Sequence, residues 1–343
     1  MSSGKWCNYC KRLIPDPGTY DMHKYRVYWE DNLCYYCNNK LNNSPPNKKK
    51  EDEGAEHKAM LMQEKPEPHN NYLNNRYLIK NYLGTGYFGE VVLALDKTLE
   101  REVAIKTLKT EHLSNIRRIR DFEIEARIIA SLNNPNIVNI YDFFDGQYIV
   151  MEYCPGGSLR NMLKGVKWRL SLIEATEVIT SVLSALSEVH NQKIIHRDIK
   201  PENILFDKSN KAKVSDFGIA QLPTSNSDRS YYGTLPYMSP EQIMDKPVDQ
   251  RSDIYSVGVV FYEILTGIHY LYNEAMGGES EIIRGILNVN PKAIERLSVD
   301  SEHNTIFNKK YNVNPILNKM MNKNPNLRFQ NAMEALEAME KLI

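Results

Sequence analysis

The sequence has no excess of charge of either sign, because 43 Lys and Arg residues balance 43 Asp and Glu residues in a chain of 343. A zero net charge argues against a protein whose main activity is to hold nucleic acid through bulk charge. The chain also lacks any run of about 18 apolar residues, so we expect no membrane-spanning helix. The first residues lack the apolar core of a signal peptide, and we therefore expect a cytoplasmic protein.

Cysteine is scarce, with five residues in the whole chain, yet four of them fall into two C-x-x-C pairs. The pairs are Cys7 with Cys10 and Cys34 with Cys37, and Cys154 stands alone. Two pairs at this spacing can supply four thiolates in a tetrahedron, which suits zinc. In a cytoplasmic chain the pattern favours a metal over two disulfides or a redox pair, and an iron site is the alternative metal centre.

Residues 1–40 are therefore a predicted four-cysteine zinc-binding module, whose small core would leave most of the folding free energy to the metal. Six Lys or Arg against four Asp or Glu give this segment a charge of only +2, so we expect a protein partner or a regulatory role rather than nucleic-acid binding. Residues 41–71 are rich in Pro, Asn and charge, which is typical of a flexible linker. Regular apolar patterning follows in residues 72–343.

The patterned region begins with strand-like segments and continues with helix-like ones. Short β-rich segments between turn residues predict strands at residues 77–83, 90–96 and 102–108. Apolar residues at helical spacing predict helices at residues 116–132, 172–190 and 252–265, the last of them buried. We therefore expect an α+β fold with a small β-rich N-lobe, about 77–153, and a larger helical C-lobe, about 154–343.

Three glycines, Gly84, Gly86 and Gly89, form a G-x-G-x-x-G motif between two predicted strands. Glycines let the backbone approach phosphate oxygens and expose N–H groups to them. A dinucleotide-binding motif would open a helix, but here the strand-like segment 91–95 follows. The pattern therefore predicts a β-hairpin that covers a nucleotide.

Lys106 lies among apolar neighbours in the next predicted strand, where a buried ammonium needs an anion. The helix that follows offers Glu123 and Glu125. Counting back nine residues from Asn134 selects Glu125 as the inward partner and leaves Glu123 on the solvated face.

Polar residues further along have the types that phosphoryl transfer requires. Asp198 can accept or orient the proton of an attacking hydroxyl, and Lys200 can neutralise the moving phosphoryl group. Asn203 and Asp216 offer oxygen ligands for magnesium, which is a hard cation. Any one of these residues could be a turn or cap residue, but the ordered set points to catalysis.

Together these motifs, His196 to Asn203 and Asp216 to Gly218 included, resemble those of eukaryotic-type (Hanks-type) protein kinases over about the last three quarters of the chain. The resemblance implies a bilobal protein kinase fold that uses ATP and Mg²⁺ to phosphorylate protein substrates. It implies that Asp198, Lys200, Asn203 and Thr234 act in catalysis, with Asn203 and Asp216 as the magnesium ligands.

The resemblance also implies a nucleotide-binding set. Lys106 would hold the α- and β-phosphates, Met151 would be the gatekeeper, and residues 152–154 would be the hinge that meets adenine through its backbone. Cys154 would then be a hinge residue and not a nucleophile. The implied set comprises Leu83, Gly84, Thr85, Gly86, Tyr87, Phe88, Gly89, Val91, Ala104, Lys106, Glu125, Met151, Glu152, Cys154, Leu205 and Asp216.

Further matches concern residues with a structural role and residues that indicate which hydroxyl accepts the phosphoryl group. Glu241 is expected to pair with Arg328, and Asp253 to hold the backbone of the catalytic loop, residues 196–203. Lys200 and Thr234 resemble serine/threonine kinases, with Thr234 expected to bond to both Asp198 and Lys200. Ser and Thr hydroxyls are therefore the expected acceptors.

The segment 268–314 departs from the family pattern, so the resemblance says nothing about its structure or its partners. Arg197 resembles the arginine that receives a phosphate from the activation segment, which lies between Asp216 and Glu241 here, and this predicts autophosphorylation within residues 224–230. The alternatives are a pseudokinase scaffold, a small-molecule phosphotransferase and a nucleic-acid-binding zinc protein with accessory kinase activity. The presence of Lys106, Asp198, Asn203 and Asp216 argues against the scaffold.

Overall fold

The computed structural model describes residues 5–6, 13–14, 72–85, 89–109, 112, 115–164, 169–217, 234–272, 278–294 and 312–342. The chain falls into two units, Met1–Asn70 and Asn71–Ile343. In the first unit, β1 (Lys5–Trp6) and β2 (Leu13–Ile14) form a short antiparallel pair. The four paired cysteines and the predicted linker lie outside the described residues.

The second unit begins with an antiparallel six-stranded sheet in the order β3-β4-β5-β6-β8-β7. Its strands are β3 (Tyr72–Leu73), β4 (Tyr77–Thr85), β5 (Gly89–Asp96), β6 (Arg101–Leu108), β7 (Ile140–Phe144) and β8 (Tyr148–Glu152). The three strands predicted from the sequence are confirmed as β4, β5 and β6, with small differences at their ends. Along the central strand β6, buried and exposed residues alternate little, because the strand is buried on both faces.

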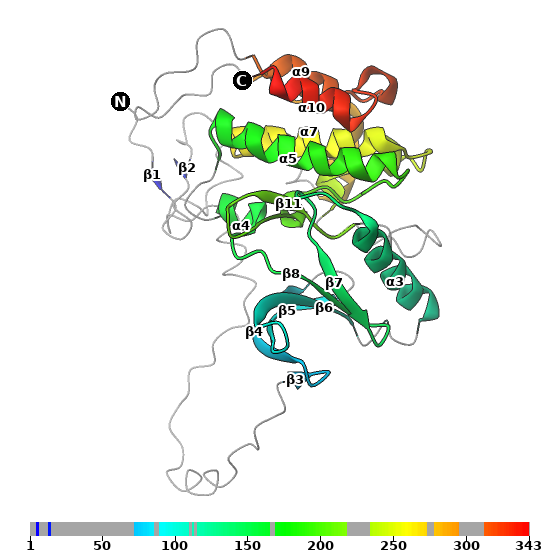
Figure 1. Cartoon of the computed structure of the whole chain (residues 1–343). Coiled ribbons are helices and arrows are strands. Elements are labelled where there is room, and N and C mark those ends of the chain that lie inside the picture. Colours follow the sequence, from blue (N-terminus) through cyan, green and yellow to red (C-terminus); the bar gives the residue numbers. More distant parts are fainter. Residues whose placement is uncertain are drawn as a thin grey trace, which may run out of the picture. The chain divides into compact units, whose positions relative to one another are not determined.

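Helix α3 (Ile116–Ser131) covers one face of this sheet, beside β7 in Figure 1. Phe122 and Ala126, four residues apart on one helical face, pack against Leu108 and Ile149 of the strands. This buried face fixes the rotation of α3 about its axis and therefore determines which of its acidic residues faces the sheet.

The C-lobe is built around two long helices, α5 (Leu172–Asn191) and α7 (Gln250–Thr266), which lie side by side in Figure 1. Helix α5 begins at a capping box in which Ser171 and Glu174 bond reciprocally, and α7 ends at Gly267 in the left-handed conformation (φ 74°). Most of α7 is buried, as predicted. Among its described residues the other α-helices are α4 (Leu159–Lys164), α6 (Pro240–Ile243), α8 (Glu279–Asn288), α9 (Asn314–Met320) and α10 (Ala332–Glu340).

A small antiparallel sheet lies on the C-lobe in the order β11-β10-β9. Its strands are β9 (Gly157–Ser158), β10 (Ile204–Phe206) and β11 (Ala212–Val214). β10 directly follows Asn203, and β11 ends two residues before Asp216. Because the two strands pair, the Ser215 N–H donates to the Asn203 carbonyl at 2.9 Å, and the sheet brings both motifs together.

The segment that departs from the family pattern contains helix α8. Its buried Ile286 packs with Leu235 and Leu271, so α8 is attached to the segment that follows Thr234. Within the described residues, no helix combines the length and apolarity that crossing a membrane requires.

Candidate active site

Lys106 extends from the centre of β6 and makes two short ion pairs. Its Nζ lies 3.0 Å from Oε1 of Glu125 on α3 and 2.7 Å from Oδ1 of Asp216. Burial alone would lower the pKa of Lys106, but the carboxylates of Asp216 and Glu125 raise it above its usual range. The lysine is therefore a fixed positive charge that joins a strand, a helix and the segment after β11.

The choice between the two glutamates of α3 is confirmed. Glu125 is 2% exposed and faces Lys106, whereas Glu123 bonds to Arg127 at 2.6 Å on the outer surface of the helix. Burial raises the pKa of Glu125, although the ammonium of Lys106 opposes this effect.

The glycine-rich motif lies in the hairpin between β4 and β5, as predicted. Gly84 pairs with Val91 and Thr85 with Glu90, while Gly86, Tyr87 and Phe88 lie outside the described residues. A Cβ atom at Gly89 would lie 2.0 Å from the carbonyl oxygen of Thr107. Only glycine fits there, so this residue lets the hairpin pass close to β6.

Asp198 is buried, and its carboxylate is held by two side chains. Lys200 Nζ lies 3.0 Å and 2.8 Å from its two carboxylate oxygens, and the Asn203 side-chain amide donates to Oδ2 at 2.9 Å. Lys200 also donates to the Thr234 hydroxyl at 2.8 Å. Lys200 thus bonds to both Asp198 and Thr234. The direct bond between Thr234 and Asp198 that we expected is not found among the described residues.

The backbone of the catalytic loop is anchored by Asp253 of α7, as predicted. The carboxylate accepts the N–H groups of His196 at 2.9 Å and Arg197 at 2.8 Å, and it contacts His190 Nε2 at 2.8 Å. Arg197 has a left-handed backbone (φ 68°), an unfavourable conformation for a long side chain that these bonds hold in place. Burial raises the pKa of Asp253, but the hydrogen bond from His190 and the nearby His196 together hold it below its usual range.

Asp216 and Asn203 have oxygens suited to a magnesium ion. The Asp216 side chain is 41% exposed, and its backbone is left-handed (φ 53°). The side-chain nitrogen of Asn203 donates to Asp198, which leaves the side-chain oxygen of Asn203 for a cation. Within the described residues, no group of three His, Cys, Asp or Glu could hold a metal alone. The carboxylate of Asp216 and the side-chain oxygen of Asn203 are hard ligands of the kind that Mg²⁺ takes together with phosphate and water oxygens.

The predicted adenine-contacting residues come from both lobes. Ala104 and Met151 are neighbours in the register of β6 and β8, and Val91 lies opposite Lys106 on β5. Leu205 comes from β10 of the C-lobe. A small cavity behind these residues is lined by Lys106, Glu125, Ile129, Val138, Ile140, Ile149, Met151, Ser215 and Asp216.

Glu152, in the segment 152–154 that the resemblance implies as the hinge, is held by a polar network that the sequence did not predict. The carboxylate of Glu152 accepts from Lys213 Nζ at 2.9 Å and from the Asn139 side chain at 2.8 Å. Lys213 is buried on β11, three residues before Asp216. The Glu152 side chain is thereby engaged, which is consistent with a hinge that offers only backbone groups to a ligand.

Cys154 should resist alkylation in the folded protein. It is 7% exposed, and burial, with a smaller effect of Glu152, raises the pKa of its thiol to about 12. Because the thiolate is the reactive species, iodoacetamide at about pH 8 should leave this cysteine unmodified for hours and label it after unfolding. Peptide mass spectrometry of native and denatured samples measures this, and fast labelling of native Cys154 would contradict it.

A second cluster missed by sequence reasoning surrounds Arg160 of α4. Its guanidinium donates to Glu202 at 2.7 Å, to Glu263 at 2.7 Å and to the Tyr237 hydroxyl. The Tyr237 hydroxyl in turn donates to Glu263 at 2.6 Å. Burial raises the pKa of Glu263, but Arg160 more than offsets this and holds the pKa of the carboxyl below its usual range. The contacts span up to 103 residues of sequence, and no local motif signals them.

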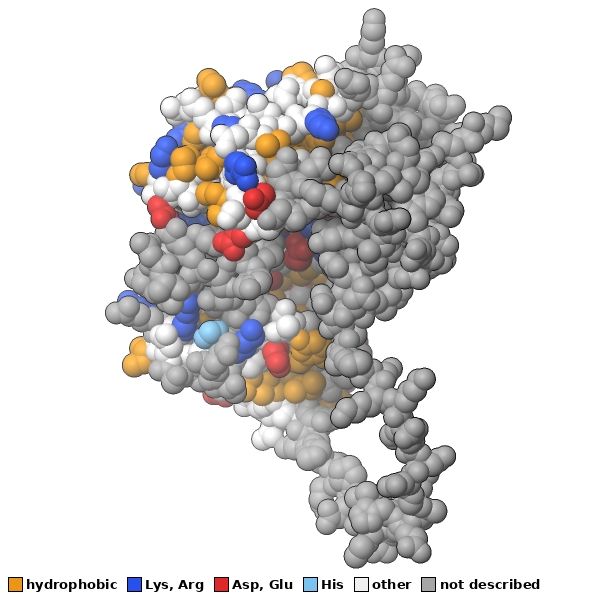
Figure 2. Space-filling view, turned by 180° about the vertical axis from the view of Figure 1, so that it is seen from behind, with side chains coloured by type: hydrophobic (Ala, Val, Ile, Leu, Met, Phe, Trp, Pro, Cys, Tyr) orange, Lys and Arg blue, Asp and Glu red, His pale blue; other side chains and the backbone are white. Residues whose placement is uncertain are grey.

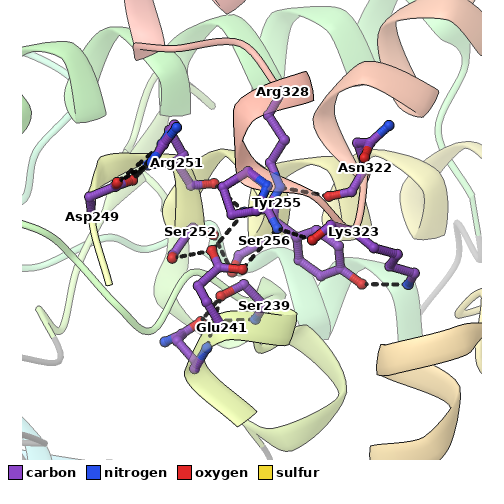
Figure 3. Close-up of polar contacts among 12 residues, drawn as sticks. Ser239, Glu241, Asp249, Arg251, Ser252, Tyr255, Ser256, Asn322, Lys323 and Arg328 are labelled. Carbon is purple, nitrogen blue, oxygen red and sulfur yellow. Dashed lines mark hydrogen bonds and ion pairs between the residues drawn. The ribbon is translucent and has the colours of Figure 1, made fainter. Parts of the chain in front are cut away.

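The predicted pair of Glu241 and Arg328 is confirmed and is shown in Figure 3. Two guanidinium nitrogens of Arg328 meet the two carboxylate oxygens at 2.7 Å and 2.8 Å, and Ser252 donates to the same carboxylate at 2.5 Å. Arg328 also donates to the carbonyl of Asn322 at 2.7 Å. This pair joins the end of the activation segment to the C-terminal part of the lobe.

Comparison with known proteins agrees with this geometry. The protein kinase domain family matches residues 77–339. A probable serine/threonine-protein kinase of Clostridium perfringens is 36% identical over 276 residues, covering 79% of this chain and 38% of that protein. The serine/threonine-protein kinase PrkC of Bacillus subtilis is 41% identical over 201 residues, 57% of this chain and 31% of that protein. PknB of Mycobacterium tuberculosis is 35% identical over 281 residues, 77% of this chain and 42% of that protein.

The chain thus spans well under half the length of these curated relatives. The family match nevertheless covers both lobes and every motif of the site described above. The chain therefore belongs to the protein kinase family, and residues 77–339 form its kinase domain.

Proposed function

We propose that this chain transfers the γ-phosphoryl group of ATP to serine and threonine hydroxyls of proteins. The observation that carries the proposal is the convergence of Lys106, Glu125 and Asp216, with Asp198 held by Lys200 and Asn203. The serine/threonine-protein kinase names of the matched relatives support the choice of acceptor.

Each charged group has a distinct role in this proposal. Lys106, oriented by Glu125, binds the α- and β-phosphates, and Asp198 accepts or orients the proton of the acceptor hydroxyl. Lys200 lies beside Asp198 and neutralises charge on the phosphoryl group as it moves. Mg²⁺, held by Asn203 and Asp216, would supply electrostatic neutralisation of the ATP phosphates. Gly84, Thr85 and Gly89 cover the phosphates, and residues of the hinge hold adenine.

Two alternatives of the same fold are less well supported. A pseudokinase scaffold would not need the intact set of Lys106, Asp198, Asn203 and Asp216. A small-molecule phosphotransferase would not need Thr234 bonded to Lys200 or the segment that Glu241 and Arg328 fix beside the site.

The test uses the full chain with labelled ATP, magnesium and a mixed peptide library. Labelled phosphoserine and phosphothreonine after hydrolysis of the products would support the proposal. Label on tyrosine alone, or ATP binding without transfer to any peptide, would overturn it.

We propose further that the activation segment is autophosphorylated within residues 224–230, which lie outside the described residues. Arg197 supports this, since its backbone is fixed by Asp253 and Gln242 next to Asp198 and its guanidinium can receive a phosphate. Mass spectrometry of active protein would measure this, and an active enzyme without phosphate in that segment would contradict it.

For residues 1–40 we propose a zinc ion held by Cys7, Cys10, Cys34 and Cys37, in a module that recruits a protein partner. The support is the spacing of these cysteines. Zinc bound per chain, measured in the full protein and in a variant with all four cysteines changed to Ser, tests the site. Equal metal content in both would overturn it, and iron in place of zinc would correct the metal.

Nucleic-acid binding remains the weaker alternative for the whole chain. On the face that Figure 2 shows, the described basic and acidic side chains are interspersed and form no continuous basic surface. A nucleic-acid footprint would need clustered Lys and Arg side chains along the bound backbone.

A further inference from the structure

Lys323 is a half-buried lysine of the C-lobe that the proposed phosphoryl transfer does not use. It lies in the loop between α9 and α10, and its Nζ donates to the Tyr255 hydroxyl of α7 at 3.1 Å, as Figure 3 shows. The Tyr255 hydroxyl lies 2.7 Å from that of Tyr270. Nζ is also 5.4 Å from the ring centroid of Tyr255 and 5.1 Å from that of Tyr270. The amine is therefore flanked by two aromatic side chains.

The surroundings of Lys323 supply no anion for its ammonium. Within the part of the chain that the structure describes, no Asp or Glu oxygen pairs with its Nζ. The carboxylate of Glu241 is already bonded to Arg328 and Ser252. Aromatic rings attract an ammonium only weakly, so the two tyrosines do not replace a carboxylate.

The charge beside Lys323 is a second cation. The guanidinium carbon of Arg328 lies 4.9 Å from the centroid of the same Tyr255 ring, and Arg328 donates to the backbone carbonyl of Lys323 at 3.3 Å. Burial and a like charge both disfavour the ammonium form of a lysine. Burial, and then Arg328, lower the pKa of Lys323 to about 8. Burial also raises the pKa of Tyr255, so its neighbour is a neutral hydroxyl.

Lys319 on α9 provides a matched comparison within the same lobe. Both lysines are half-buried, and each lies near an aromatic ring, that of Phe329 at 4.1 Å in the case of Lys319. Lys319 differs in having a carboxylate partner, Glu334, at 2.7 Å. A difference in reactivity between the two amines therefore reports the missing anion at Lys323.

We propose that Lys323 is a covalent modification site, at which the neutral amine takes an acyl group from an activated carboxylic acid, an acyl phosphate or an acyl thioester. The Nζ lone pair forms a C–N bond to the acyl carbon. The bond from that carbon to the phosphate oxygen or thiol sulfur breaks, and phosphate or thiolate leaves with the electron pair. The proton released from Nζ passes to water. The product is a neutral amide, which removes one of the two positive charges beside Tyr255. The reaction uses neither ATP nor Asp198, so it is independent of the proposed kinase activity.

The experiment incubates the full chain at pH 7.5 with acetyl phosphate in one arm and an acetyl thioester in the other. Peptide mass spectrometry follows acetylation of Lys323 and Lys319. At this pH an amine with a pKa of about 8 is about one quarter neutral, whereas an ordinary lysine near 10.4 is neutral in about one molecule per thousand. The less basic amine is also a weaker nucleophile, so Lys323 should react about tenfold faster than Lys319 rather than by the full ratio. The donor that labels Lys323 identifies the source of the acyl group.

Unfolding in urea is the control, because it exposes both lysines to the same solvent. The ratio of the two rates should then fall to near one. In the native protein the rate at Lys323 should level off above about pH 9, where its amine is neutral. Labelling of native Lys319 as fast as Lys323 with both donors would overturn the proposal, and so would a rate at Lys323 that still rises tenfold per pH unit beyond about pH 9.

Discussion

Asp198→Asn should lower phosphoryl transfer to peptides by about 10²–10⁴-fold, the usual contribution of a general base. The amide keeps the size of the carboxylate but cannot accept a proton, and it leaves Lys200 without its anionic partner 2.8 Å away. Transfer of labelled phosphate from ATP to a peptide measures the loss. Nucleotide affinity, measured separately by fluorescence, should change much less, because the proposed phosphate contacts come from Lys106 and the glycine-rich hairpin.

Asp145→Asn is the matched control for this substitution. Asp145 lies in the exposed turn between β7 and β8 with a left-handed backbone (φ 52°), a conformation that Asn tolerates well. It removes the same formal charge far along the chain from the catalytic loop, so transfer should stay near the wild-type rate. Equal losses in both variants, or no loss in Asp198→Asn, would remove Asp198 from the mechanism.

Arg328→Met should destabilise the C-lobe by about 3–5 kcal/mol, because it leaves the Glu241 carboxylate buried without its partner. Arg328 is 1% exposed and also donates to the backbone carbonyls of Asn322 in the loop before it and of Arg251 on α7, so several acceptors lose their donor at once. Urea unfolding followed by circular dichroism measures the change in free energy of unfolding. A loss below about 1 kcal/mol, the value for an exposed pair, would contradict the buried pair described here.

The double variant Glu241→Gln with Arg328→Met should recover part of that stability, since it removes the unpaired charge. The wild-type pair also predicts a pH dependence. Burial raises the pKa of Glu241, but the hydrogen bonds from Arg328 outweigh it and hold the pKa below its ordinary value of 4.5. The stabilisation is therefore complete above the unfolded pKa and disappears as the pH falls through the lower folded pKa. The double variant should lack this acid-side loss.

The parts of the site that the sequence predicted correctly are those set by local periodicity and ordered motifs. The spacing from Asn134 selects Glu125 over Glu123, and the structure agrees because the helix that buries Phe122 and Ala126 turns Glu125 toward the same sheet. The buried character of α7 followed from its nearly uniform apolar composition. The pairs made by Lys106, Asp253 and Glu241 followed from the order of motifs along the chain.

The contacts that could not be predicted from the sequence join distant segments of the chain, and no periodic pattern of residues marks them. Arg160 meets Glu263 across 103 residues, and Lys213 meets Glu152 across 61. A lone Arg or Lys in a sequence is usually a solvated surface residue, and only packing reveals that these two are mostly buried. Helix α8 was not assigned because its segment departs from the family pattern, although its Ile282, Ile283 and Ile286 lie at helical spacing.

The anchoring of the catalytic loop on Asp253 has a consequence for how activity is lost. The loop donates two backbone hydrogen bonds to a carboxylate that is 1% exposed inside the C-lobe, so the geometry of the loop depends on the packing of the protein interior. Small cavities cut into α7 far from any phosphate should therefore displace the loop, and heat inactivation should coincide with melting of that lobe rather than precede it.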